Sequence, residues 1–221
     1  MHSCLEGIRL VAFDLDGTLI DSVPDLAAAV DVMLIERELA PAGAALVRDW
    51  VGNGSRKLIE RALRYATGSV PDESTLDTAH TAFLEHYARA PHTRTRVYPR
   101  VKEALAALKQ QGLILVLVTN KPHAFVAPIL DAFDLADYFE LTLGGDSLAQ
   151  KKPDPAPLLY MANQFGVPGE QCLMIGDSRH DMEAGKRAGF RTLAVPYGYN
   201  HGEPIIASKP DLIVESLGEL V

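Results

Sequence analysis

Long apolar runs are missing from this sequence. The longest, residues 113–118, is far too short to cross a bilayer, which excludes a membrane-spanning helix. The first residues, MHSCLE, contain neither the basic segment nor the apolar segment that opens a secretory signal. We therefore expect a cytoplasmic protein that makes no use of a membrane.

Cysteine and clustered positive charge are also scarce. The two cysteines, Cys4 and Cys172, are far apart and neither belongs to a Cys-x-x-Cys or Cys/His cluster, which argues against a disulfide or a zinc site. The chain has 29 acidic and 21 basic residues, a formal net charge of -8, and no dense basic run. We therefore expect no nucleic acid as a partner, and a small anionic substrate would need positive charge gathered at its site.

The sequence does contain enough apolar material for a core. With 48% hydrophobic residues over 221 positions, the chain is too apolar to stay disordered, and its length suits one large or two small domains. Short apolar runs alternate with helical patterns, which predicts an α/β protein with a doubly wound, mostly parallel sheet. The expected strands are residues 8–13, 114–118, 141–143, 172–175 and 192–195.

The segment 21–94 breaks this alternation. It contains amphipathic helices, linked by turn formers, and no convincing buried strand. Ser22 is the expected N-cap of the first helix, and 56–66 and 74–90 are further helices. We predict that 21–94 is a helical domain inserted into a discontinuous sheet domain, which consists of residues 1–20 and 95–221.

Two carboxylates follow the first predicted strand. Asp14 and Asp16 lie where open α/β sheets place their ligands, and strand alternation points both the same way. A buried pair of like charges is costly unless a cation or a shared proton compensates it, so the pair suggests a metal site or acid/base chemistry. A polar turn is the alternative, since Asp16-Gly17 is a common turn dipeptide.

Further polar residues stand near the ends of other predicted strands. Thr119 and Asn120 offer a hydroxyl, an amide and backbone N–H groups that could hold a phosphate, with a structural turn as the alternative. Lys151 and Lys152 precede Pro153, which stiffens their loop, and either lysine alone could be a solvated surface charge.

Two more aspartates complete the set. Asp177 and Asp181 stand at helical spacing where a loop opens a helix, a position at which they could instead complement the helix dipole. Taken together, the four groups supply three or four carboxylates, a hydroxyl and a lysine at one edge of a sheet. Oxygen ligands of this kind suit Mg²⁺, which bridges to substrate phosphate.

In their order along the chain, these residues resemble the motifs of the haloacid dehalogenase superfamily. The motifs are Asp14-x-Asp16-Gly17-Thr18, Thr119-Asn120, Lys152-Pro153 and Gly176-Asp177-x-x-x-Asp181. The resemblance covers essentially the whole chain, and 21–94 resembles the helical cap domain of that superfamily, which makes the remainder its catalytic core. Shorter segments, at 50–54, 119–122, 176–179 and 197–200, are similar to those of phosphoglycolate phosphatases.

The resemblance implies an activity and a role for each motif residue. The implied activity is Mg²⁺-dependent hydrolysis of a phosphomonoester, 2-phosphoglycolate, to glycolate and phosphate through an aspartyl-phosphate intermediate. Asp14 is the implied nucleophile, and Asp16 the acid/base that protonates the leaving alkoxide and then activates water. Mg²⁺ is expected on the Asp14 carboxylate, the Asp16 backbone carbonyl and Asp177, with Asp181 as a supporting or water-mediated ligand.

Three groups are expected to hold the phosphoryl oxygens: the Thr119 hydroxyl, the Asn120 backbone N–H and the Lys152 ammonium. Lys152 is preferred to Lys151 because the lysine of the superfamily directly precedes the proline.

The expected cap should read the rest of the substrate. Our candidates there are Gly52, Asn53, Gly54 and Arg56, since a Gly-Asn-Gly turn could bring backbone N–H groups to a small carboxylate and the arginine could add positive charge. A helix start with a solvated arginine is the alternative. We expect structural roles for the residues His180, Tyr197, Tyr199 and Asn200.

Other functions stay open at this point. Within the superfamily they are a phosphatase for another small ester such as a sugar phosphate, a phosphosugar mutase, and a dehalogenase, which would not need Asp16. From another class, a receiver-like phospho-acceptor module shares a strand-end aspartate, a threonine, a lysine and Mg²⁺, but it lacks a helical cap. Amphipathic spacing does not separate a monomer from a homodimer.

Overall fold

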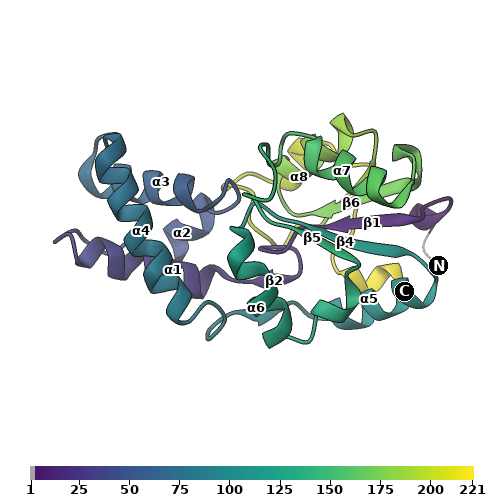
Figure 1. Cartoon of the computed structure of the whole chain (residues 1–221), viewed down its shortest axis with the longest axis horizontal. Helices are drawn as coiled ribbons and strands as arrows, with labels where there is room; N and C mark the ends of the chain where they lie inside the picture. Colours follow the sequence, from purple (N-terminus) through teal and green to yellow (C-terminus); the bar gives the residue numbers. More distant parts are fainter. Residues whose placement is uncertain (1–2) are drawn as a thin grey trace.

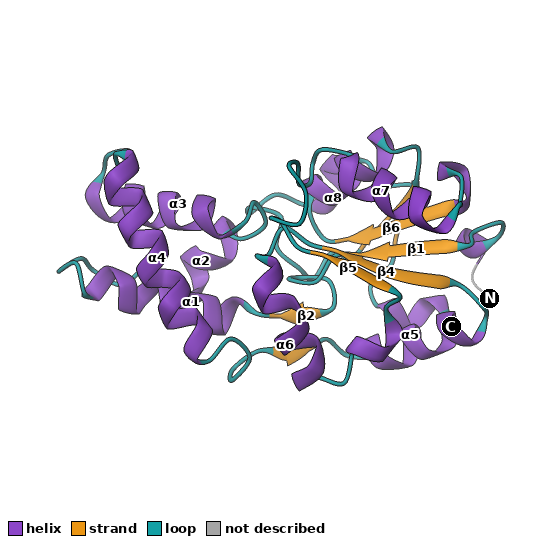
Figure 2. Ribbon diagram, in the orientation of Figure 1, coloured by secondary structure: helices purple, strands orange, loops and turns teal. Residues whose placement is uncertain are grey.

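The computed structural model describes residues 3–221. Figures 1 and 2 show two units along the long axis, a helical unit at one end and a sheet covered by helices at the other, where the C-terminus lies. Within the described part of the chain, no helix combines the length and the apolar character needed to cross a bilayer.

The large sheet is parallel throughout, in the strand order β5-β4-β1-β6-β7-β8. Its strands are β1 (Leu10–Phe13), β4 (Ile114–Val118), β5 (Leu141–Leu143), β6 (Cys172–Gly176), β7 (Arg191–Ala194) and β8 (Leu212–Ile213). Because β1 is central, Phe13 lies in register with Leu117 on one side and Ile175 on the other. The predicted doubly wound α/β fold is confirmed.

Helices cover both faces of this sheet, as the unbroken apolar runs predict. The covering helices are α5 (Val101–Gln110), α6 (Val126–Ala132), α7 (Ala156–Phe165) and α8 (Arg179–Arg187). Val11 and Phe13 pack with α5 and α6, whereas Leu10 and Ala12 pack with α7 and α8. Figure 1 shows these two helix pairs on opposite sides of the strands. Alternate residues of one strand therefore anchor two separate layers.

Short 3-10 helices fill the connections. They are η1 (Ser3–Leu5), η2 (His123–Phe125), η3 (Ala136–Tyr138), η4 (Gly169–Gln171), η5 (Ile205–Ser208) and η6 (Leu217–Leu220).

The helical unit has a core of its own. It consists of α1 (Val23–Ile35), α2 (Gly43–Trp50), α3 (Ser55–Thr67) and α4 (Glu73–Arg89). Val30, Met33, Ile59 and Phe83 are buried together in it. Since these helices all fall within 21–94, we retain the division into an inserted cap and a discontinuous core as a proposal.

Two chain crossings join the units through an antiparallel ladder that the sequence did not predict. In this ladder β2 (Ile20–Asp21) leads into α1 and β3 (Arg96–Val97) leads back toward the sheet. The buried Asp25 secures the junction, because its carboxylate accepts the backbone N–H groups of Arg94 and Thr95 and the Thr95 hydroxyl at 2.7 to 3.0 Å. The place where the two units meet is thus fixed by hydrogen bonds.

Candidate active site

The polar residues singled out in the sequence converge at the carboxyl ends of the strands. Asp14 follows β1, Thr119 and Asn120 follow β4, Asp177 follows β6, and Lys152 lies on the loop that precedes α7. Parallel strands end at the same edge of a sheet, so residues far apart in sequence meet there. A cavity lies beside them, between the sheet and the cap helices.

Asp14 is a buried carboxylate that faces a buried lysine. The Lys152 ammonium lies 2.9 Å from Asp14 Oδ1 and 2.7 Å from Asp181 Oδ1. Burial raises the pKa of Asp14 to about 7, the Lys152 charge opposes this rise, and the Asp181 charge adds to it. The structure thus places Lys152, rather than Lys151, against Asp14. Lys151 is exposed, and its ammonium lies beside Gly54 of the cap loop, 2.9 Å from where a Cβ of that residue would stand.

Asp177 is held by two donors in a space that only glycine leaves free. Its carboxylate accepts the Thr18 hydroxyl at 2.7 Å and the Tyr199 backbone N–H at 2.6 Å. A Cβ at Gly17 or at Gly198 would lie 2.2 or 2.3 Å from Asp177 Oδ2, so a side chain at either position would displace the carboxylate. Burial, followed by the charges of neighbouring carboxylates, raises the pKa of Asp177 well above its usual value.

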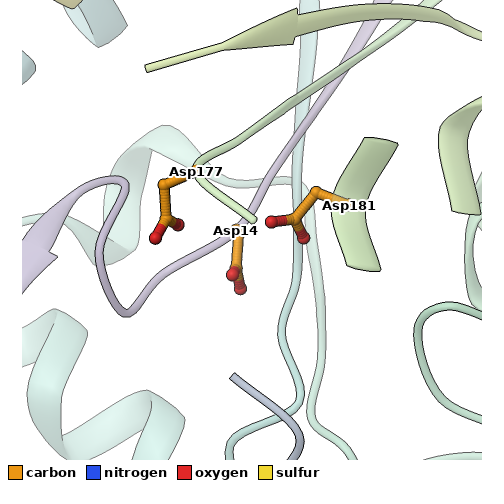
Figure 3. A group of neighbouring side chains, drawn as sticks. All are labelled: Asp14, Asp177 and Asp181. Atoms are coloured by element: carbon orange, nitrogen blue, oxygen red, sulfur yellow. The ribbon is translucent and has the colours of Figure 1, made fainter. Parts of the chain in front are cut away.

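The three buried carboxylates fit a metal ion. One oxygen from each of Asp14, Asp177 and Asp181 lies within 4.8 Å of the others, and Figure 3 shows the side chains gathered around a common space. Like charges at this separation in a buried site need a cation or protons to compensate them, and Lys152 supplies a single positive charge. Carboxylate oxygens are the ligands that Mg²⁺ prefers, so the donor chemistry agrees with the expected cofactor.

Asp181 also has structural partners. Its Oδ1 pairs with Lys152, and its Oδ2 accepts the Ser178 backbone N–H at 3.0 Å and the Ser178 hydroxyl at 2.7 Å. The contact with the Ser178 backbone N–H belongs to the capping box that begins α8. Asp181 therefore starts a helix and positions Lys152 while it belongs to the acidic cluster.

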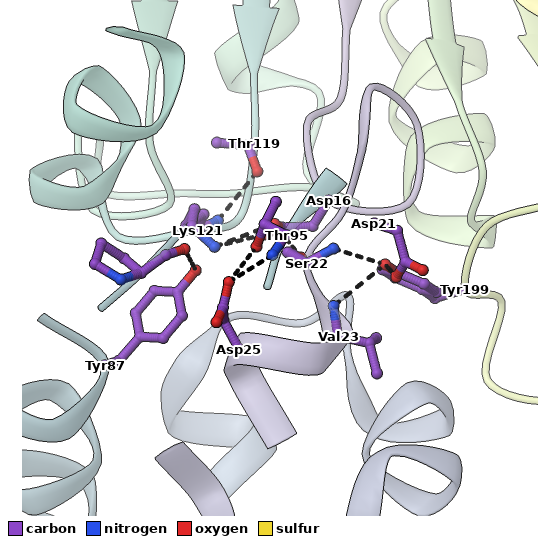
Figure 4. Close-up of polar contacts among 11 residues, drawn as sticks. Asp16, Asp21, Ser22, Val23, Asp25, Tyr87, Thr95, Thr119, Lys121 and Tyr199 are labelled. Carbon is purple, nitrogen blue, oxygen red and sulfur yellow. Dashed lines mark hydrogen bonds and ion pairs between the residues drawn. The ribbon is translucent and has the colours of Figure 1, made fainter. Parts of the chain in front are cut away.

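Asp16 lies on the same cavity as Asp14 but pairs with a different lysine. The Lys121 ammonium lies 3.1 Å from each Asp16 carboxylate oxygen, and the Ser22 hydroxyl donates to Oδ1 at 2.6 Å (Figure 4). The sequence predicted that Asp14 and Asp16 point the same way, and both side chains do line this cavity. Ser22 does stand at the N-cap position of α1, but its side chain binds Asp16 and makes no capping hydrogen bond.

Thr119 and Asn120 both line the cavity as well. The Thr119 hydroxyl accepts the Lys121 backbone N–H at 3.2 Å, which fixes the turn after β4. The Asn120 side chain donates to two carbonyl oxygens, Gly52 O in the cap and Lys152 O in the core, each at 2.9 Å. Asn120 therefore ties the cap loop and the lysine loop together.

The cap loop meets the core at the predicted Gly-Asn-Gly turn. Gly52 and Gly54 line the cavity with φ angles of +122° and +87°, which residues with a side chain rarely adopt. Asn53 does not line it. Its Oδ1 instead contacts His180 Nε2 of the core at 2.8 Å and accepts a hydrogen bond from Arg61 at 3.1 Å. Within this turn the glycines face the cavity, and the asparagine bridges the two units.

The structure does not bring Arg56 to the cavity. Its guanidinium pairs with Glu73 and Asp77 on the exposed side of the cap. The helix start with an outward arginine, considered from the sequence as the alternative, is what the structure shows. The reason is local, because α3 and α4 pack side by side and the two acidic side chains of α4 lie within reach of α3.

Two of the residues expected to be structural, His180 and Tyr199, make contacts that order the site. Burial, followed by the neighbouring His201, lowers the pKa of His180 to about 4, so the imidazole is neutral at physiological pH and can bridge Asn53 and His201. The Tyr199 hydroxyl accepts the Ser22 backbone N–H at 2.9 Å and donates to Asp21. These contacts join the last loop of the core to the start of the cap.

Sequence reasoning missed several residues that shape the site. Lys121 and Ser22 hold Asp16, Thr18 holds Asp177, and Tyr87 of α4 covers the Lys121 ammonium at 4.8 Å from its ring centroid. Thr18 and Lys121 belong to segments noted for their resemblance, which was the available signal. Ser22 was expected only as a helix N-cap, although Asp16 is six residues away. For Tyr87 the signal was absent, because Lys121 is far away in the sequence.

Comparison with known proteins agrees with this geometry. The family described as haloacid dehalogenase-like hydrolase matches residues 8–189. The phosphoglycolate phosphatase of Pseudomonas putida is 49% identical over 214 residues, which cover 96% of this chain and 78% of the relative. The phosphoglycolate phosphatase of Escherichia coli O157:H7 is 44% identical over 235 residues, which cover 99% and 93%.

Solved structures of related proteins have the same fold. A predicted phosphoglycolate phosphatase from Haemophilus somnus 129PT superimposes with a TM-score of 0.93 at 40% identity, over 97% of this chain and 96% of that chain. CbbY from Rhodobacter sphaeroides, in complex with phosphate, has a TM-score of 0.80 at 24% identity over 96% of both chains, a likeness in fold alone. This chain belongs to the haloacid dehalogenase-like hydrolase family, as the order of its motifs predicted.

Proposed function

We propose that this enzyme hydrolyses 2-phosphoglycolate to glycolate and phosphate, with Mg²⁺ as cofactor and an aspartyl-phosphate as intermediate. The observation that carries the proposal is the buried group of Asp14, Lys152 and Asp177 at the edge of a small cavity beneath the cap. The printed names of relatives that are 44% and 49% identical support the same substrate.

Asp14 is the proposed nucleophile. One carboxylate oxygen attacks the phosphorus in line, so that a bond forms between Asp14 and phosphorus while the bond to the bridging oxygen breaks. Water then attacks the phosphorus, releases phosphate and regenerates the carboxylate. Lys152, 2.9 Å from Asp14, is placed to hold phosphoryl oxygens through both steps, together with the Thr119 hydroxyl and the Asn120 backbone N–H.

Asp16 is the proposed acid and base. It gives a proton to the leaving alkoxide in the first step and takes one from the attacking water in the second. The contacts from Lys121 and Ser22 hold its carboxylate beside the cavity, so it is oriented before substrate binds. This pre-orientation supports acid/base work at a fixed place.

Mg²⁺ would be held by the Asp14 carboxylate, the Asp16 backbone carbonyl and Asp177, with Asp181 in support. When bound, the ion neutralises the negative charge that the carboxylates and the phosphoryl group bring together. Thr18 and the Tyr199 backbone N–H fix the Asp177 oxygens for this task.

The cavity supports a small leaving group. The cavity has a volume of about 40 Å³. Gly52 and Gly54 approach from the cap without side chains, so backbone groups close this space over the site. A short leaving group such as glycolate suits this enclosure better than a sugar.

The competing functions are weaker on these observations. The helical cap argues against a receiver-like module, and the well-held Asp16 argues against a dehalogenase. A phosphosugar mutase or a phosphatase for sugar phosphates would need more room beneath the cap. The net charge of -8 supports a small-molecule ester rather than nucleic acid as the partner. The proposal includes a cytoplasmic setting and a monomer or homodimer.

The test is initial-rate phosphate release with Mg²⁺ across a panel of esters. We expect kcat/KM for 2-phosphoglycolate to exceed the values for sugar phosphates, nucleotides and pyrophosphate by roughly 100-fold or more. Turnover far above one phosphate per enzyme would exclude a phospho-acceptor module. Efficient turnover of the other esters without this preference would refute the substrate while leaving the Asp14 mechanism intact.

A further inference from the structure

Lys121 is a buried cation that has no role in the four family motifs described above. Its side chain is 2% exposed, and its ammonium contacts both carboxylate oxygens of Asp16 at 3.1 Å. Burial acts to lower the pKa of Lys121, but the Asp16 charge beside it raises the pKa above its ordinary value. The side chain is therefore a fixed positive charge on the cavity wall.

The wall around this charge is largely apolar. Lys121 is the only Lys or Arg among the described residues that line the cavity. The apolar side chains of the wall include Leu26, Val51, Leu58, Phe83, Leu84 and Phe125. Lys152, the other buried lysine of the site, already contacts Asp14 and Asp181 at the phosphoryl end. A negative group on the leaving part of a substrate would thus meet one cation.

We propose that Lys121 is the specificity-determining residue, whose ammonium binds the carboxylate of the leaving group. The inference rests on the proposed function and names the side chain that reads its substrate. Asp16 serves the bridging oxygen, and in 2-phosphoglycolate the carbon that bears this oxygen also bears the carboxylate. An ammonium in contact with Asp16 is therefore in the right place for that carboxylate. In a sugar or glycerol phosphate a neutral hydroxyl takes this place.

The cap strengthens the same interaction. Tyr87, from α4, places its ring over the ammonium at 4.8 Å from the centroid, while its hydroxyl donates to Pro91 O at 3.2 Å (Figure 4). When the cap lies on the core, the ring and the apolar wall exclude water from Lys121. Attraction between opposite charges is stronger where water is excluded. The exclusion of water therefore strengthens the binding of a substrate carboxylate to Lys121, whereas a substrate hydroxyl has no charge to pair with the ammonium.

The kinetic test compares two esters that differ at this one group. They are 2-phosphoglycolate and 2-hydroxyethyl phosphate, in which an alcohol replaces the carboxylate. In Lys121→Met we expect the ratio of the two kcat/KM values to fall about 100-fold, since the change removes a hydrogen-bonded charge. Lys121→Arg should keep most of the preference. The matched control is Lys57→Met, which removes an exposed charge of cap helix α3 outside the cavity lining and should leave the ratio unchanged.

The outcomes separate the two levels of the proposal. If both esters slow equally in Lys121→Met, the lysine only positions Asp16 and the inference is wrong. If the wild type prefers 2-phosphoglycolate and Lys121→Met retains that preference, the inference again fails while the proposed function stands. A wild type without any preference would remove the proposed function itself.

A binding measurement avoids the coupling of Lys121 to Asp16. We would titrate 3-phosphonopropionate, a phosphonate that cannot be hydrolysed and keeps the carboxylate, and propylphosphonate, which lacks it. Calorimetry should show the carboxylate ligand binding the wild type roughly 10- to 100-fold more tightly, and Lys121→Met binding both alike. An undiminished difference in the variant would overturn the inference. Lys121→Gln is the second neutral variant if circular dichroism shows Lys121→Met to be unfolded.

Discussion

The two sides of the cavity differ in the kind of residues that line them. On the sheet side, charged groups are buried and each is held by another polar side chain, as Lys152 holds Asp14 and Lys121 holds Asp16. On the cap side the wall consists mainly of apolar and aromatic side chains together with Gly52 and Gly54. The difference indicates that one unit carries the chemistry in a preset form, while the other encloses the substrate.

The hydrogen bonds between the cap side and the sheet side support this division of roles. Asn120 donates to Gly52 O, and His180 contacts Asn53, so the cap loop is held to the core by single hydrogen bonds. Such bonds contribute about 1 kcal/mol each and can be exchanged for water when the cap lifts. We expect changes on the sheet side to reduce kcat strongly and changes at this seam to raise KM modestly.

The largest effect should follow Asp14→Asn, on the sheet side. The amide keeps the shape of the side chain but is a poor nucleophile, so kcat should fall on the order of 10⁴-fold. Because burial of the Asp14 charge is costly, the variant should fold and be no less stable without metal. Phosphate release and thermal unfolding check both points, with Asp131→Asn on the exposed side of α6 as control. Residual turnover within tenfold of the wild type would refute the nucleophile.

An intermediate effect should follow removal of Mg²⁺. Burial raises the pKa of Asp14 from 3.8 to about 7, partly offset by Lys152, and the pKa of Asp177 also rises. The folded, metal-free protein therefore binds protons more tightly there than the unfolded chain does. The stability that these groups give is full below about pH 4 and is lost as the pH rises through about 7.

Thermal unfolding in EDTA and in Mg²⁺ measures this effect. The midpoint in EDTA should drop between about pH 5 and about pH 8, and Mg²⁺ should restore more at the higher pH, where the carboxylates are charged. The same gain at both pH values would show that the acidic cluster is not the site that binds the ion.

The smallest effect is expected at the seam. Asn53→Ala removes the contact to His180 that exists only while the cap lies on the core, so KM should rise about fivefold with kcat changed less than about twofold. Steady-state kinetics on 2-phosphoglycolate measure both constants, and Asn163→Ala on the exposed face of α7 is the control. A large fall in kcat would contradict the division of roles in which the sheet side carries the chemistry and the cap side encloses the substrate.

Most strands could be predicted because each is an unbroken apolar run in a sheet buried on both faces. The structure adds β8 (Leu212–Ile213), which is too short and too exposed to leave such a run, and α2 (Gly43–Trp50), in which Val47 is the one described buried residue. The ladder of β2 and β3 was missed because each strand has two residues. Periodicity gives a signal only where burial repeats over several residues.

The residues that meet at the carboxyl edge of the sheet could be grouped from the sequence alone. A carboxylate that directly follows a parallel strand has its place set by the strand, so the positions of Asp14 and Asp177 in the chain were enough to group them. The partner of each charge follows instead from tertiary packing: Asp16 pairs with Lys121, and Arg56 pairs with the acidic residues of α4. Such pairings depend on how elements that are distant in the chain pack against each other. A local sequence pattern does not contain this information.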